Sequence, residues 1–276
     1  MNRVAAVQVF LLAILGILLS GCGGGSSSSR PMPGPSPTPI TFFSGLYEIN
    51  NASAVNPGTN FTLQGSLLQS GNNLSGVMHA SGLSCFSFNT DIPVRGLLGI
   101  DNTGNFTVNL VFSLPSGQTL SLNTIHPFGH FSFISGTYLL DGAGCAVPDQ
   151  GNVVGESLSI GGSWMGHFNS SGGVVSQVTN MTLTQTGPDA HGFFSATGTA
   201  TITGGTCFSN ATVDPASVIV GTGSTLIFDN AQPGTTGKTI IQGDLASGVI
   251  GSNFNGTYIS TQDTCSETGT VTFFFG

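Results

Sequence analysis

The feature that most constrains the fold of this chain is an internal repeat. LLQSGNNLSGVMHASG (67–82) aligns without a gap on LTQTGPDAHGFFSATG (183–198), which places Gly76 on Gly192. Further matches join Cys85 with Cys207, GTYLLDGAGC (136–145) with GTYISTQDTC (256–265), and FSGLY (43–47) with WMGHF (164–168). The offset stays between 116 and 122 positions, so each unit has about 115 residues. A period of this length indicates two tandem domains, each large enough for its own core.

Each unit carries short alternating segments separated by turn signals such as SGNN, DNTGN and PSGQ, where Asn and Gly accept a positive φ. In NFTVNLVFS, every second residue from Phe106 to Phe112 is apolar and shares one face. We predict strands over 42–50, 60–69, 74–80, 92–100, 105–113, 118–125, 130–140 and 151–158. The fold class is therefore all-β, with domains at 41–159 and 160–276. Two tandem antiparallel up-and-down barrels are expected, with a two-sheet sandwich as the alternative.

The first forty residues predict export. Arg3 precedes the apolar run VQVFLLAILGILL, which has the layout of a secretory signal and is too short for a spanning helix. Leu19-Ser20-Gly21-Cys22 resembles the bacterial lipobox. The resemblance implies removal of residues 1–21, lipidation of Cys22 and the lipid bilayer as a partner. An ordinary signal peptide with a chance cysteine is the alternative.

Residues 22–40 then read as a tether, GGGSSSSRPMPGPSPTP being flexible at first and polyproline-like afterwards. Gly23 follows the cysteine where lipobox proteins retained in the inner membrane usually carry Asp. The resemblance therefore implies the outer membrane. A porin-like transmembrane barrel is the competing hypothesis, opposed by the lipobox, the tether and the scarcity of Tyr and Trp.

The charge excludes a nucleic-acid partner. Beyond the signal the bases are Arg30, Arg95 and Lys238, against twelve acids in the whole chain. A protein with this balance has no basic surface for phosphates or anionic lipids.

Gly162-Ser163-Trp164 resembles the Gly-x-Trp start of lipocalin and avidin-like barrels. That resemblance implies a Trp that plugs one barrel end. The first unit departs from it, because the alignment puts Phe43 opposite Trp164 with no glycine two places earlier.

Four cysteines remain after Cys22, in an exported protein where disulfides persist. Repeat symmetry selects the pairs Cys85–Cys145 and Cys207–Cys265 among three possible pairings. Zinc binding is the alternative, and the CxxC spacing for it is lacking. In an up-and-down barrel these cysteines follow strands three and seven, so each disulfide closes one mouth. A ligand would then enter at the other end, near SGNN and TGPDA.

No catalytic motif is recognisable, so we expect neither an enzyme nor a cofactor or metal. Isolated acids read as solvated turn residues: Asp101, Asp141, Asp149, Asp189, Asp214, Asp229 and Asp244. His126 and His130 read as a turn with one packed imidazole rather than a metal pair. His79 and His191 lie near equivalent strands without aligning, which argues against a shared catalytic duty. Core packing is the expected role of Tyr138, Trp164 and Tyr258, and lining a pocket is the alternative.

These features predict an outer-membrane-anchored lipoprotein, surface or periplasmic, whose two β domains form a non-enzymatic binding module for a small ligand, a glycan or an envelope partner. A structural or adhesive role without a pocket is the first alternative. An unrecognised hydrolase is the second.

We predict lipidation at Cys22. Cells fed labelled palmitate should label the wild-type protein and not the Cys22→Ser variant, because the acyl chains attach to that residue. Recovery of the wild-type protein in the aqueous phase after detergent phase separation would contradict this.

Overall fold

The structure of this chain is a computed structural model. It describes residues 43–56, 58–83, 87–126, 133–144, 147–205, 207, 210–229, 237–248, 251–262 and 265–276. Cys22, the tether, Cys85, His130 and Cys145 lie outside these ranges, so the predictions on them stay predictions. Residues 39–276 belong to one compact unit. A search of the described ranges for a helix long and apolar enough to cross a membrane finds none.

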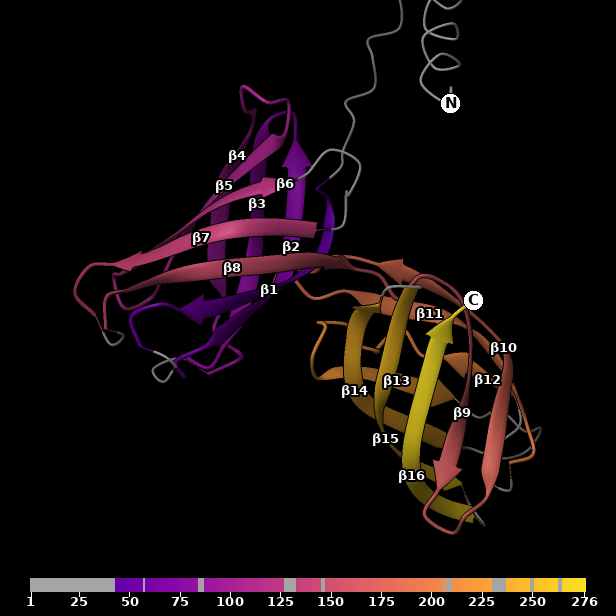
Figure 1. Ribbon diagram of the computed structural model, residues 1–276. Coiled ribbons are helices and arrows are strands. Elements are labelled where there is room, and N and C mark those ends of the chain that lie inside the picture. Colours follow the sequence, from indigo (N-terminus) through magenta and orange to yellow (C-terminus); the bar gives the residue numbers. More distant parts are fainter. Residues whose placement is uncertain are drawn as a thin grey trace, which may run out of the picture. The chain divides into compact units, whose positions relative to one another are not determined.

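The described chain forms two closed antiparallel barrels of eight strands each (Figure 1). The first contains β1 (Gly45–Ser53), β2 (Phe61–Ser70), β3 (Asn73–Ser81), β4 (Ile92–Ile100), β5 (Phe106–Ser113), β6 (Thr119–His126), β7 (Phe133–Asp141) and β8 (Asp149–Leu158). The second contains β9 (Gly162–Ser170), β10 (Val175–Thr186), β11 (Ser195–Thr203), β12 (Asn210–Val213), β13 (Ser224–Asp229), β14 (Lys238–Gly248), β15 (Gly251–Gln262) and β16 (Cys265–Phe275). The all-β prediction with tandem barrels is confirmed, and the sandwich alternative is wrong.

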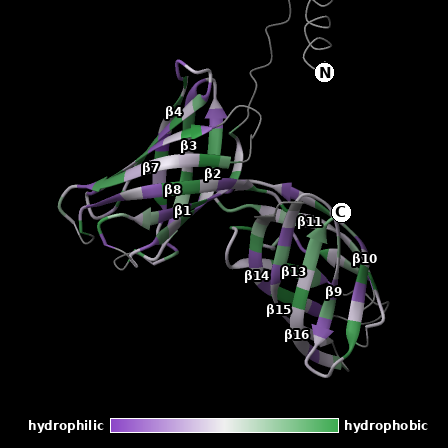
Figure 2. Cartoon of the chain, viewed as in Figure 1, coloured by the Kyte–Doolittle hydropathy of each residue, from purple (hydrophilic) through white to green (hydrophobic). Residues whose placement is uncertain are grey.

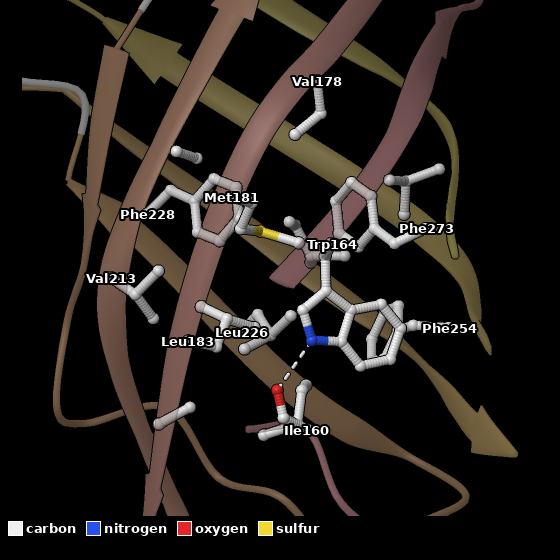
Figure 3. Close-up of a cluster of buried hydrophobic side chains, with 14 of the residues drawn as sticks. Ile160, Trp164, Val178, Met181, Leu183, Val213, Leu226, Phe228, Phe254 and Phe273 are labelled. Carbon is white, nitrogen blue, oxygen red and sulfur yellow. Dashed lines mark hydrogen bonds between the residues drawn. The ribbon is translucent and has the colours of Figure 1, made fainter. Parts of the chain in front are cut away.

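Alternation along the strands closes each sheet around an apolar interior. Figure 2 shows green and purple residues alternating along many strands. In β5, Val108, Leu110 and Phe112 are fully buried, as their common face predicts. In the second barrel, large side chains from many strands point toward one another around Trp164, whose Nε1–H donates to the Ile160 carbonyl oxygen at 2.8 Å (Figure 3). Tyr138, Trp164 and Tyr258 are at most 2% exposed, so core packing is their role.

The repeat is real, but the alignment at its front is wrong. β1 begins at Gly45 and β9 at Gly162, so Tyr47 corresponds to Trp164 and the first barrel keeps the glycine two places before its aromatic residue. Equivalent hydrogen bonds of Gln69 and Gln185 support this alignment. Gln69 Oε1 accepts the backbone N–H of Phe43 at 3.1 Å, and Gln185 Oε1 accepts that of Ile160 at 2.8 Å. The similar letters of FSGLY and WMGHF are therefore a chance match.

The gap-free alignment of 67–82 on 183–198 is also wrong beyond the first turn. Gly76 corresponds to Gly198 and not to Gly192, because an added Cβ would collide with the carbonyl oxygen of Ser66 in one case and of Thr182 in the other. Between β2 and β3 lie two residues, 71–72, whereas between β10 and β11 lie eight, 187–194. The second unit therefore carries a six-residue insertion, which we call the inserted loop (187–194).

The two ends of the second barrel are closed by different means. Cys207, after the third strand of this barrel, and Cys265, after the seventh, form a disulfide with Cα atoms 5.4 Å apart, as predicted. Cys207 is 4% exposed and belongs to the core cluster, against which Cys265 packs. At the other end, Phe275 pairs with Trp164 at the beginning of β9, and the Trp164 side chain is 1% exposed. The pairing Cys85–Cys145 stays a prediction.

Each barrel also buries a tyrosine hydroxyl against a carboxylate. Tyr138 donates to Asp149 Oδ2 at 2.8 Å, and Tyr258 donates to Glu267. Burial and then Asp149 raise the pKa of Tyr138 to about 12. The Asp149 side chain also accepts from Ser53 at 2.7 Å and is only 9% exposed, so the prediction of a solvated turn residue is wrong.

We predict that Tyr138→Phe lowers the free energy of unfolding by about 1–3 kcal/mol, because it leaves a buried carboxylate oxygen without its donor. Chemical denaturation at neutral pH measures the change. Leu139→Ala, at the exposed neighbouring position, is the control and should change the stability by less than about 0.5 kcal/mol. Equal stability of Tyr138→Phe and the wild type would contradict the prediction.

Candidate functional site

The first barrel has an outer face, on β8, β1, β2 and β3, where most of the side chains named below are buried. We call it the docking face. Cross-strand register places on it the rows Leu158–Leu46–Ser66 and Glu156–Glu48–Gln64–His79. Leu46 and Leu158 alternate with inward-facing residues, yet both are at most 2% exposed and belong to the core cluster of the second barrel. The second barrel therefore packs against this face.

Two glycines of the second barrel make the close approach possible. Gly192 in the inserted loop has φ of +81°, and a Cβ there would collide with the Val77 carbonyl oxygen. Gly221 has φ of +94°, and a Cβ there would lie 2.9 Å from Glu48 Oε2. A side chain at either position would be strained by the backbone and obstructed by the first barrel.

Glu48 forms the first polar contact across the docking face. Its Oε2 accepts from Gln64 Nε2 at 2.6 Å, and from the Thr222 N–H at 3.3 Å and hydroxyl at 3.1 Å. A carboxylate that accepts several hydrogen bonds is a strong partner when water is partly excluded. Thr222 thereby fastens the segment after β12 to the first barrel.

His79, Asp91 and His191 form the second polar contact, which we call the clasp. His79 is 1% exposed, and its Nε2–H donates to the His191 carbonyl oxygen at 2.7 Å. The His79 ring stacks on Phe193 with centroids 4.4 Å apart. His191 Nδ1 lies 2.8 Å from Asp91 Oδ2, and this hydrogen bond is the main cause that raises the pKa of His191. The clasp joins β3 and the segment before β4 to the inserted loop.

His79 and His191 do not align in the repeat and were expected to share no catalytic duty, yet the structure brings them into contact. They meet across the two barrels rather than at equivalent positions of them. A signal was present in the sequence, since the offset rises from 116 at Gln185 to 122 at Cys207 and so marks an insertion between them. The role of Asp91 carried no comparable signal.

The other predicted site residues lie elsewhere. His126 is fully buried, donates from Nδ1 to the Phe133 carbonyl oxygen and packs edge-on against Phe43. It is therefore a packed imidazole, as expected. A search of the described residues for three or more His, Cys, Asp or Glu side chains placed to hold a metal finds no group.

A groove of about 360 Å³ runs beside the clasp, between the inserted loop and residues 215–218. Its lining is Thr186, Gly187, Pro188, Asp189, Phe193, Phe194, Ser195, Pro215, Ala216, Ser217 and Val218. Asp189 Oδ1 accepts the N–H groups of His191 and Phe193, each at 2.9 Å, which fixes the turn. Residues 186–189 of TGPDA line this groove, and Trp164, which is 1% exposed, is not part of its lining.

A second hollow of about 440 Å³ lies on the outer face of β3, β4 and β5. It is lined by Asn73, Leu74, Arg95, Gly96, Leu97, Asn109 and Val111. This hollow is part of a regular sheet surface, whereas the groove is built by the inserted loop. We therefore take the groove as the candidate site.

Comparisons with known proteins give no family for this chain. No family model and no curated protein matches it. Two solved chains match; one is described as a "putative AttH" from Nitrosomonas europaea, with 10% identity over 91% of this chain and 98% of that chain and a TM-score of 0.20. At that TM-score the likeness carries no argument.

We predict that Gly192→Ala separates the docked barrels while both stay folded. The added methyl group collides with the Val77 backbone. Backbone ¹⁵N relaxation should then give each barrel a shorter correlation time than in the wild type. Gly173→Ala is the matched control, because Gly173 also has a positive φ, +84°, and an added Cβ there meets nothing within 4 Å. A Gly192→Ala protein that still tumbles as one body would show that this contact does not hold the barrels together.

Proposed function

We propose that this protein is an exported, lipid-anchored outer-membrane protein whose two-barrel body is a non-enzymatic binding module. The groove beside the inserted loop is its ligand site. The observation that carries the proposal is this groove, whose volume of about 360 Å³ falls in the range of small-ligand sites, roughly 300–1,000 Å³.

The groove chemistry suits a small saccharide. Pro188, Phe193 and Pro215 offer apolar surfaces for the face of a sugar ring. The carboxylate of Asp189 is an acceptor for sugar hydroxyl or amide donors, and Thr186 and Ser195 add hydroxyl groups that lie 2.6 Å from each other. Apolar walls with a few convergent polar groups are typical of ligand sites.

Binding is favoured over catalysis by what the groove contains. Asp189 is the one titratable side chain among its lining residues. Nucleophilic or acid–base catalysis needs a second group within hydrogen-bond reach. A lone carboxylate that also fixes its own turn is better suited to hold a ligand than to transfer a proton.

The proposed localisation rests on the lipobox-like motif that ends at Cys22. Acylation at Cys22 would hold the chain to the bilayer, and residues 23–40 would give a relaxed span of roughly 25 Å. That distance is enough to keep a binding body clear of lipid headgroups.

A structural spacer is the second candidate function. It is favoured by the apolar side chains that fill the described interior of the second barrel, because a packed barrel needs no ligand to be stable. The two candidates differ in whether the groove binds anything.

We predict that N-acetylglucosamine and its β-1,4-linked dimer shift the amide signals of the inserted loop and of residues 216–218 in an NMR titration. The acetamido group supplies a donor for Asp189 and a methyl group for the apolar walls. Asp189→Asn keeps a side-chain acceptor for the turn but loses the charge, so the affinity should fall about tenfold.

Asp101→Asn is the control, because Asp101 Oδ1 accepts the N–H groups of Thr103 and Asn105 in a similar turn of the first barrel. That variant should bind as the wild type does. Absence of shifts at the groove, or equal binding by Asp189→Asn, would contradict the saccharide site and favour the spacer.

A further inference from the structure

We infer that the first barrel controls the shape of the groove in the second barrel through the clasp, and that the clasp responds to protons. The inference depends on the proposed function only in regarding the groove as a ligand site. Its structural part, that groove residues move with the clasp, stands independently.

The first barrel holds the inserted loop at consecutive residues that begin with His191. The His191 carbonyl oxygen accepts from buried His79, and the His191 side chain pairs with Asp91 at 2.8 Å. The next residue, Gly192, lies against the backbone of Val77. A backbone hydrogen bond, a side-chain pair and a close backbone approach therefore fix the position of the inserted loop relative to the first barrel.

The same loop carries the groove. Asp189 Oδ1 accepts the N–H groups of His191 and Phe193. These hydrogen bonds join His191 of the clasp to two residues that line the groove, Asp189 and Phe193. Phe193 also stacks on His79 while it lines the groove. A shift of His191 therefore displaces the carboxylate and one apolar wall together. The coupling runs through one contiguous set of contacts and needs no distant pathway.

Several charged and titratable groups face or surround His191. Asp91 lies on the segment before β4, His79 on β3, and Asp189 on the inserted loop itself. Glu48 on β1 and Glu156 on β8 lie further along the docking face, in the same row as His79. Glu48 is engaged by Thr222, so Asp91 is the carboxylate that pairs with His191.

The sign of the proton response follows from the pair. Asp91, through its hydrogen bond and then its charge, raises the pKa of His191 above 6.5. A group with a raised pKa in the docked state stabilises that state fully below its undocked value and loses the stabilisation as the pH rises through the docked value. The loop should therefore be held most firmly below about pH 6.5 and less firmly toward pH 9.

The size of the response is modest, because the side chains are 62% exposed for His191 and 40% exposed for Asp91. Exposed pairs of this kind change an equilibrium by about twofold to fivefold. The hydrogen bond from buried His79 to the His191 carbonyl oxygen is a separate contact between the barrels.

The test is an NMR titration of the intact two-barrel protein from pH 6 to pH 9. In the wild type, the imidazole signal of His191 should titrate with a midpoint above 6.5. The amide signals of Asp189, Gly192 and Phe193 should shift with the same midpoint. In His191→Gln, which keeps a donor but does not titrate, the amide shifts should be lost. In Asp91→Asn, which keeps an acceptor but loses the charge, their midpoint should fall below that of the wild type. Glu156→Gln, further along the same face, should behave as the wild type does.

The outcomes separate the inference from the proposed function. Amide signals that do not titrate, or that titrate equally in Asp91→Asn, overturn the inference. If they titrate as expected, N-acetylglucosamine dimer is then added at pH 6 and pH 9. An affinity that falls about twofold to fivefold at pH 9 supports the control of binding, and equal affinity overturns it. Titrating signals without any saccharide binding support the clasp and refute the saccharide site alone.

Discussion

Each sheet closes on its own first strand, and this closure determines how the two barrels can contact each other. β1 pairs with β8 and β9 pairs with β16, so neither barrel has an unpaired edge strand. Closed barrels cannot join by adding strands to one another. The barrels must therefore meet through outward side chains and connecting loops, which is what the docking face and the inserted loop provide.

The insertion explains why two copies of one unit have different roles. The turn at 71–72 is as short as a hairpin allows, whereas residues 187–194 leave the sheet. The last residue of the inserted loop, Phe194, pairs with Ile219 of its own barrel, whereas His191 and Gly192 contact the first barrel. Without the second barrel, the outward Leu46 and His79 would expose an apolar surface and an imidazole. One copy supplies the surface and the other the loop.

Much of the fold was predictable because period-two alternation and turn residues are local signals. The strand predicted at 92–100 coincides with β4, and the predicted pairing Cys207–Cys265 is present. The candidate site was not predictable, because its parts come from both units. Gly192 aligned convincingly with Gly76 by letters alone, and the true partner, Gly198, was recognisable only from what a Cβ would touch. The burial of Asp149 was not predictable either, because its donors, Tyr138 and Ser53, lie on other strands of the first barrel.

The short connection between the barrels makes a weak clasp sufficient. Residues 159–161 alone separate β8 from β9, so the two docking surfaces meet at a high effective concentration. An exposed pair such as Asp91 and His191 would contribute little to the association of separate molecules. Within one chain, the same pair acts on a loop that is already held by His79 and Gly192, and a small free-energy change is enough to move it. Because the two copies are joined in one chain, the exposed pair of Asp91 and His191 can influence the shape of the neighbouring groove.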